Sequence, residues 1–356
     1  MLGIRWAGRL QMSLLAPLMA LLAMLMGGVP GLPGAPGDGS VPPLPSGGTQ
    51  GPLPGHYFSG SYINAAGTRK YMGYTPSSYE KGTRLPLIVA LHGCTQSADT
   101  LRQQTKFDNL AEAKKFIVVY PEQPSSASPM RCWNWFNPSH MQRGSGEPSI
   151  IAGIAEWVQQ HYRVDRERIF VAGFSAGGAM AAVMGATYPD LFAAIGVGSG
   201  LQYGGSSLDP TQAGQAAYNA MGTFARPMPT LIFHGGQDSI VPVTNADKLV
   251  RQWQTTAELA DDGVINGSVP AAPVKTLGER SAGGQSYTVT RYDDAQGREF
   301  VQYWLVPDMG HAWSGGCSCT AYSDPDGPDE AVTMYNFFAS HPMPHESLAA
   351  SPVPLG

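Results

Sequence analysis

The sequence predicts an α/β fold built on a mostly parallel central β-sheet. Two continuous apolar runs, at residues 85–91 and 116–120, have the composition of strands that are buried on both faces. Such runs alternate along the chain with segments of helical periodicity, for example the apolar positions between Ile150 and His161. Alternation of buried strands with helices is typical of a parallel sheet that is flanked by helices.

Composition divides the chain into four parts. Residues 1–28 hold two arginines and then a long apolar run, as in a secretory signal peptide. An uncleaved N-terminal anchor is the alternative, because no clear cleavage site follows. Glycine and proline make up most of residues 29–55, which predicts a linker. We therefore expect a folded domain over 56–340, a tail over 341–356, and a secreted or periplasmic protein that meets a membrane only if the N-terminal segment is retained.

The remaining elements follow from periodicity and turn residues. Residues 57–64 and 68–75 predict a hairpin, which gives the sheet antiparallel first strands. Short apolar runs predict further strands near Ile169 and over 193–197 and 230–234. Helices are expected over 98–114, after Asp209, over 245–259 and from Pro328 to Phe338, with a late hairpin of 286–292 and 299–306.

One turn carries the strongest chemical signal. The stretch Gly173-Phe174-Ser175-Ala176-Gly177 has the pattern Gly-x-Ser-x-Gly between a β-branched strand and a run of small helical residues. This is the context of a nucleophile elbow, in which a sharp, strained turn exposes the serine hydroxyl. The N–H of Ala176, at a helix N-terminus, is placed to stabilise an oxyanion. The alternative is a glycine-rich turn with a solvated serine.

Polar residues follow three of the expected strands. Ser175 follows the strand near Ile169, Asp238 follows 230–234, and His311 follows 299–306. Functional groups gather at the carboxyl ends of parallel strands. A serine needs a base to take its proton, and the base needs a carboxylate to orient it. The order Ser, Asp, His is that of α/β-hydrolases, so we predict Ser175 as nucleophile, Asp238 as acid and His311 as base.

Other residues compete for the acid and base roles. Asp209 precedes a proline and is typical of a helix start, and Asp308 is too close in sequence to His311 to orient it easily. His92 and His234 directly follow apolar runs, where a hydrogen-bonded core histidine is the usual occupant. We interpret His234 in that way.

Four cysteines occur, and with a secretory signal disulfides are permitted. They allow three pairings, and a Cys317–Cys319 bridge would close a small, strained ring. The second oxyanion donor of this fold comes from the loop after an early strand, so the N–H of Cys94 or of Thr95 is the candidate. We favour a Cys94–Cys132 pair because it would make that loop rigid.

Three tryptophans lie near these motifs. Trp133 and Trp135 follow Cys132, and Trp313 follows His311 by two positions. If Cys94 is joined to Cys132, the first two lie beside the active site and are candidates to line a substrate cleft. Ordinary packing of large apolar side chains is the alternative for all three.

Charge and composition exclude several classes of partner. The net charge is −5 and no run of Lys or Arg is present, which argues against nucleic-acid binding. The Cys-x-Cys spacing does not match a zinc site, and triad chemistry requires neither a metal nor an organic cofactor. We expect no cofactor, and the sequence does not indicate an oligomeric state.

Four motifs resemble the polyhydroxybutyrate (PHB) depolymerase family of esterases. They are Leu-His-Gly-Cys-Thr-Gln at 91–96, Cys-Trp-Asn-Trp-Phe at 132–136, Gly-Phe-Ser-Ala-Gly-Gly-Ala-Met at 173–180 and Gly-His-Ala-Trp-Ser-Gly-Gly at 310–316. The resemblance covers nearly all of 57–340. It implies an α/β-hydrolase fold and a secreted serine carboxylesterase. It supports Ser175, Asp238 and His311 as a triad, with the Cys94 N–H in the oxyanion hole.

The resemblance also implies the kind of substrate, a polyester or a small ester. The expected substrates are short-chain 3-hydroxybutyrate esters, oligomers or amorphous polymer, hydrolysed through an acyl-enzyme. Relatives that act on feruloyl esters, acetyl-xylan or oxidised polyvinyl alcohol give the alternative, and an inactive binding scaffold is a third reading. Residues after 340 do not resemble a polymer-adsorbing domain, and Cys317-Ser318-Cys319 departs from the family pattern.

Overall fold

The computed structural model describes residues 53–80 and 82–344. The expected signal peptide or anchor, most of the linker and the tail after 344 lie outside the described residues. The first described strand, β1, is His56–Asn64, and the last helix, α8, is Glu330–Ser340. None of the described helices is long and apolar enough to span a membrane.

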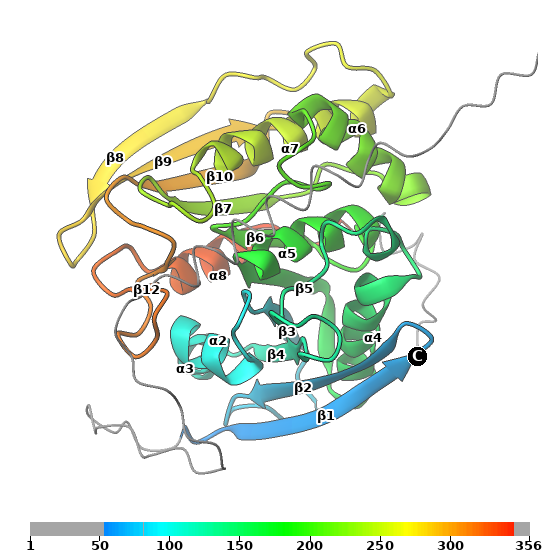
Figure 1. Ribbon diagram of the computed structural model, residues 1–356, viewed down its shortest axis with the longest axis vertical. Helices are drawn as coiled ribbons and strands as arrows, with labels where there is room; N and C mark the ends of the chain where they lie inside the picture. Colours follow the sequence, from blue (N-terminus) through cyan, green and yellow to red (C-terminus); the bar gives the residue numbers. More distant parts are fainter. Residues whose placement is uncertain (1–52, 81, 345–356) are drawn as a thin grey trace, which may run out of the picture. The chain divides into compact units, whose positions relative to one another are not determined.

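Within the described residues, ten strands form one sheet in the order β1-β2-β4-β3-β5-β6-β7-β10-β9-β8 (Figure 1). The strands from β4 to β10 in this order run parallel, whereas β1, β2, β9 and β8 pair antiparallel. The mostly parallel sheet with antiparallel first strands is therefore confirmed. The bounds are β2 Gly67–Thr75, β3 Leu85–Leu91, β4 Ile117–Glu122, β5 Val164–Phe174, β6 Ala194–Gly198, β7 Thr230–Gly235, β8 Lys275–Arg280, β9 Ser286–Asp293 and β10 Glu299–Val306. A separate two-stranded sheet pairs β11 Trp313–Ser314 with β12 Ser323–Asp324.

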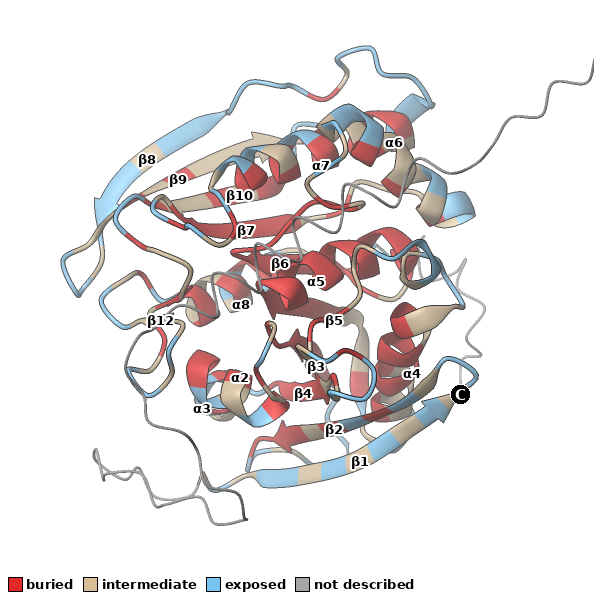
Figure 2. Cartoon of the chain, in the orientation of Figure 1, coloured by how far each residue is buried: buried red, intermediate tan, exposed pale blue. Residues whose placement is uncertain are grey.

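Helices cover both faces of the sheet. Side chains alternate between faces along each strand, so Leu87 and Val89 enter one core while Ile88 and Ala90 enter the other. The first core includes α4, α5, α6 and α7, and the second includes α2, α3 and α8. The central strands are accordingly buried, whereas β1 and β8 are largely exposed (Figure 2). The bounds are α2 Ala98–Thr105, α3 Phe107–Lys114, α4 Gly146–His161, α5 Ala176–Thr187, α6 Pro210–Met221 and α7 Thr244–Asp262.

Several local expectations need correction. The single helix expected over 98–114 is two helices, because Lys106 adopts a left-handed conformation with φ 55°. Strand β8 was not predicted, because its residues are exposed at the sheet edge and carry no apolar alternation. The start of the expected tail packs on the domain, since Met343 is buried and its N–H donates to the carbonyl of Glu167 at 2.7 Å. The helix start at Asp209 is confirmed, because this side chain caps α6 by accepting from the N–H of Thr211.

Candidate active site

Ser175 lies at a sharp turn between β5 and α5, with φ 56° and ψ −119°. A positive φ is strained for a residue with a side chain, and such strain is characteristic of a nucleophile elbow. A Cβ atom on Gly173 would collide with the backbone of Gly177, and one on Gly177 would collide with the carbonyl of Leu91. The two glycines of the motif are therefore needed for the turn to approach the end of β3.

The backbone of Ser175 is held from two sides. Its N–H donates to the carbonyl of Gly198 at the end of β6 at 2.8 Å, and its carbonyl accepts from the N–H of Ala179 at 3.0 Å. The residue as a whole is 9% exposed. The strained turn is thus fixed by the neighbouring strand and by the first turn of α5.

The structure brings Asp238 and His311 together. His311 Nδ1 lies 2.7 Å from Asp238 Oδ2, while Asp238 Oδ1 accepts from the N–H groups of Ile240 and Val241 at 2.9 and 2.8 Å. The carboxylate is fully buried. Because a carboxylate can only accept, His311 carries its proton on Nδ1, and Nε2 is left to accept a proton.

Backbone contacts align the two loops that carry these residues. The N–H of Gly236 donates to the carbonyl of Val306 and that of Gln237 donates to the carbonyl of Met309, both at 2.9 Å. A Cβ on Gly235 would collide with the carbonyls of Met309 and Gly310. The loops after the parallel neighbours β7 and β10 are therefore packed directly on each other.

Aromatic rings place His311 beside the elbow. The His311 ring lies 4.9 Å from the ring of Phe174, which directly precedes Ser175, and 5.9 Å from the ring of Tyr322. Tyr322 was not singled out from the sequence, where no local signal distinguishes it. It borders the imidazole only because the loop between β11 and β12 folds back over His311.

The loop after β3 borders Ser175. A Cβ built on Gly93 would lie 3.2 Å from Ser175 Cβ. The next residue, Cys94, forms a disulfide with Cys132, which is the pairing that the sequence analysis favoured. The N–H of Thr95 donates to the carbonyl of Met130 at 2.6 Å, so of the two candidate oxyanion donors it is already engaged.

The structure also joins Cys317 to Cys319, a pairing that the sequence left open and for which we expected a small ring. The turn places their Cα atoms 5.2 Å apart, which lies within the ordinary range for disulfides.

His92 holds the loop after β3 from within the core. Its Nε2 accepts from the N–H of Gln123 at 3.0 Å, so its proton is on Nδ1, which lies 2.7 Å from the carbonyl oxygen of Gly93. Burial lowers the pKa of His92 to about 4, so the ring is neutral. The carbonyl of Gly93 and the N–H of Cys94 belong to one trans peptide and point in opposite directions. His92 therefore fixes the direction of the Cys94 N–H.

The sequence over residues 70–268, more than half of the chain, matches the family described as "Esterase PHB depolymerase". The chain belongs to this family. Poly(3-hydroxyalkanoate) depolymerase C of Paucimonas lemoignei is 30% identical over 241 residues, which are 64% of this chain and 54% of that protein. Acetylxylan esterase A of Talaromyces purpureogenus is 31% identical over 211 residues, which are 53% of this chain and 54% of that protein. The chain thus spans about half the length of the curated relatives it matches.

A solved structure of an acetyl xylan esterase from Aspergillus awamori has a TM-score of 0.61 and 24% identity. It covers 79% of this chain and 99% of that chain. This likeness concerns the fold. Together with the parallel sheet and its order, it confirms that this member of the PHB depolymerase family has an α/β-hydrolase fold.

The competing acids and bases contact other groups in this family member, although His234 Nε2 also lies 3.5 Å from Asp238 Oδ2. His234 is buried, its Nε2 lies 2.8 Å from the carbonyl oxygen of Val241, and burial lowers its pKa, as for a core histidine. Asp308 Oδ1 is 3.5 Å from Gln237 Nε2, whereas the carboxylate that contacts His311 Nδ1 is that of Asp238. Neither contact is suited to activating a serine.

The three tryptophans differ in exposure. Trp133 and Trp313 are 0% and 1% exposed, so in this structure they pack in the core and offer no surface to a substrate. Trp135 is half-buried. With Ile240 it packs against a small apolar cluster beside the elbow, formed by Ala179, Leu201 and Val241. Cleft lining therefore stays a prediction for Trp135 alone. Ile240 was not predicted as its neighbour, because the position of Ile240 depends on how the loop that carries Asp238 folds.

A buried carboxylate supports the segment that carries Trp135. Glu147 is completely buried and accepts from the backbone N–H of Asn134 at 2.6 Å and from its side-chain amide at 2.7 Å. Its charge is balanced by Arg69 at 3.2 Å. Gln123, which also contacts His92, donates to the same carboxylate and to the carbonyl of Cys132. The disulfide segment and the loop after β3 thus share one buried support.

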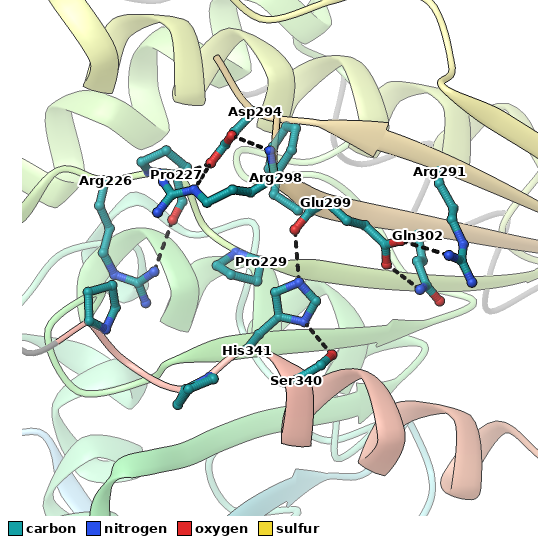
Figure 3. Close-up of a pocket in the computed structure, with 13 residues that line it drawn as sticks. Arg226, Pro227, Pro229, Arg291, Asp294, Arg298, Glu299, Gln302, Ser340 and His341 are labelled. Atoms are coloured by element: carbon teal, nitrogen blue, oxygen red, sulfur yellow. Dashed lines mark hydrogen bonds and ion pairs between the residues drawn. The ribbon is translucent and has the colours of Figure 1, made fainter. Parts of the chain in front are cut away.

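A separate cavity of about 760 Å³ lies at the opposite edge of the sheet, where β7 and β10 begin (Figure 3). Its arginines already have partners: Arg298 pairs with Asp294, Arg291 pairs with Glu299, and Arg226 donates to backbone carbonyls. It is not part of the candidate active site. Among the described residues, no group of His, Cys, Asp and Glu side chains could hold a metal ion.

Proposed function

We propose that this protein is a serine carboxylesterase that uses Ser175, His311 and Asp238 as its triad. The observation that carries the proposal is the 2.7 Å contact between His311 Nδ1 and a fully buried Asp238 carboxylate. This pair follows β10 and β7, at the same edge of the sheet as the strained Ser175 turn. Family membership supports ester hydrolysis as the reaction.

In the proposed mechanism, Ser175 Oγ attacks the ester carbonyl carbon while His311 Nε2 takes the hydroxyl proton. Asp238 stabilises the imidazolium that forms. The tetrahedral oxyanion accepts hydrogen bonds from the N–H groups of Ala176 and Cys94. Collapse of this intermediate expels the alkoxide, which takes the proton from His311 and leaves as the alcohol. Water, deprotonated by the same nitrogen, then releases the acid and restores Ser175.

For the substrate we propose short-chain 3-hydroxybutyrate esters, their oligomers or amorphous polymer. The similarity to a poly(3-hydroxyalkanoate) depolymerase supports this class, as does the uncharged surface of Trp135 and Ile240 beside the elbow. Acetyl groups on xylan are the second candidate, because several acetylxylan esterases are similar to the same part of the chain. We also propose a secreted or periplasmic location, which the two disulfides support.

The test compares product release from the two substrate classes. Wild-type protein is incubated with amorphous polyhydroxybutyrate and its oligomers, and separately with acetylated xylan. Ser175→Ala is the inactive variant, with an expected loss of about a millionfold. Ser61→Ala, on the exposed edge of β1, is the matched control.

Serine-dependent release of 3-hydroxybutyrate supports the proposal. Serine-dependent release of acetate alone keeps the esterase and moves the substrate to xylan. If neither product forms and nitrophenyl butyrate is not hydrolysed, the esterase proposal is wrong.

A further inference from the structure

Gln104, at the end of α2, is completely buried and contacts two loops that border the candidate active site. Its Oε1 accepts from Gln96 Nε2 at 2.6 Å, and Gln96 belongs to the loop after β3. Its Nε2 donates to the backbone carbonyl of Tyr322, in the loop that follows His311. One side chain therefore joins the oxyanion side of the site to the histidine side.

The hydrogen bonds form a chain with a fixed direction. Gly93 N–H donates to Gln96 Oε1 at 2.8 Å, the Gln96 amide donates to Gln104, and the Gln104 amide donates to Tyr322. A backbone N–H can only donate and a backbone carbonyl can only accept, so the two ends fix the orientation of both amides. If either amide were flipped, a donor would face a donor or an acceptor would face an acceptor.

Each end of this hydrogen-bond chain lies next to a residue that the proposed reaction uses. Gly93 precedes Cys94, and its own carbonyl is held by His92, so both sides of this residue are fixed. The Tyr322 carbonyl also accepts from the N–H of Trp313 at 2.9 Å, two residues after His311.

The backbone of Gln104 adds a third link. Its carbonyl accepts from the N–H of Cys317 at 3.1 Å, in the segment that the second disulfide closes. The loop that returns over His311 is thus attached to α2 at two points, through one residue.

We propose that Gln104 is a positioning residue that couples two loops. One is the loop after β3, residues 92–97, which we call the oxyanion loop. The other is the loop after β10 that carries His311 and continues to Tyr322, which we call the histidine loop, and Gln104 keeps both at fixed positions relative to Ser175. This inference rests on the proposed esterase function. A carboxamide is required because it accepts at one atom and donates at another. Methionine has a similar length and does neither well, and an ionised glutamate cannot donate to the Tyr322 carbonyl.

The test uses Gln104→Met and Gln104→Glu, with Gln103→Met as the matched control. Gln103 is the exposed neighbour on α2 and donates only to Asp99 among the hydrogen bonds described. Rates on nitrophenyl butyrate are divided by the number of active serines, titrated with a fluorophosphonate. We expect both Gln104 variants to lower kcat by at least about tenfold with KM nearly unchanged, because small displacements of catalytic groups are costly.

A tetrahedral inhibitor separates positioning from folding. An alkyl boronic acid mimics the oxyanion intermediate, so its affinity should fall in parallel with kcat in the Gln104 variants. A residue that only fills the core would lower the titrated fraction of active enzyme and leave kcat per active serine and boronate affinity unchanged. That result overturns the inference.

The coupling itself is tested by the pair Gln96→Met and Gln104→Met. Because the two side chains act in one chain, the double variant should lose little more kcat than either single variant. Fully additive losses contradict the inference.

Amide hydrogen exchange gives a readout that does not need activity. Gln104→Met should speed exchange in peptides covering 92–97 and 313–323, and Gln103→Met should not.

If wild-type protein hydrolyses no ester while exchange still rises in both loops, the proposed function fails and the coupling stands. If ester hydrolysis is normal and exchange rises in neither loop, the coupling fails and the function stands.

Discussion

The backbone N–H of Gln237 donates to the carbonyl oxygen of Met309 at 2.9 Å. This bond joins the loop that carries Asp238 to the loop that carries His311, one residue before the acid and two before the base. The loops that carry Asp238 and His311, the proposed acid and base, are therefore aligned by backbone contacts as well as by the contact between the two side chains. It follows that a substitution that keeps the oxygen accepting from the N–H groups of Ile240 and Val241, such as Asp238→Asn, should leave the loop frame in place.

Asp238→Asn should abolish most activity without unfolding the protein. An amide at this position can donate to His311 Nδ1, which favours the wrong imidazole tautomer, and kcat is expected to fall by about 10⁴-fold. Near-ultraviolet circular dichroism should be unchanged because the loop contacts remain. Asp308→Asn is the control and should keep its activity. If the Asp238 variant retains full kcat, the acid has been assigned wrongly.

His92 should make the protein less stable in acid. Its pKa is about 4 in the folded protein, below the ordinary 6.5, because burial disfavours the charged ring. Between these two values the unfolded chain binds a proton that the folded protein does not. The free energy of unfolding therefore falls as the pH drops through this window, by about 3 kcal/mol in all.

Urea unfolding at neutral and mildly acidic pH measures this loss of stability. His92→Gln should be less stable at neutral pH, and its stability should depend less on pH. His161→Gln, at an exposed position on α4, should keep the wild-type dependence. An unchanged slope in the His92 variant would show that another group is responsible.

Removing the Cys94–Cys132 disulfide should reduce both stability and turnover. The bond spans 38 residues, for which the loss of chain entropy predicts about 4 kcal/mol of stabilisation. The paired change Cys94→Ser with Cys132→Ser also frees the oxyanion loop, so kcat should fall. Cys317→Ser with Cys319→Ser is the comparison: its bond spans only 2 residues and should contribute much less through this entropy. Equal thermal shifts in the two double variants would contradict this account.

Gly177→Ala should prevent the elbow from forming. The added methyl group would collide with the backbone carbonyl of Leu91, which cannot move without distorting β3. We expect a loss of at least about 3 kcal/mol, at the upper end of overpacking effects, and no measurable turnover. Gly278→Ala is the control because a Cβ there meets no atom within 4 Å. Thermal unfolding and activity are measured on both variants.

The features that were predictable from sequence are those set by local pattern. The apolar runs of β3 and β4 identify buried strands wherever they lie in the sheet. A polar residue that follows a parallel strand lies at the edge of the sheet where the carboxyl ends of these strands meet. The pairing of Asp238 with His311 was expected in this way and is present, whereas the role of Ser175 stays a prediction. Asp209 was recognised as a cap because capping needs only its immediate neighbours.

What could not be predicted depends on contacts between distant segments. Lys106 interrupts the helix at a position with no glycine or proline to mark it. The burial of Trp133 and Trp313 follows from which side of the sheet their loops reach. Gln104 and Tyr322 have no motif, and their relation exists only because α2 lies against a loop more than two hundred residues later.

Every residue of α5 is buried, and nearly all are glycine, alanine, methionine or valine. The helix that follows Ser175 therefore has no exposed face on which a substitution would be expected to be neutral. If Ser175 is the nucleophile, we therefore expect changes of substrate preference to come from the loops after β4, β6, β7 and β10 and not from the helix that follows it.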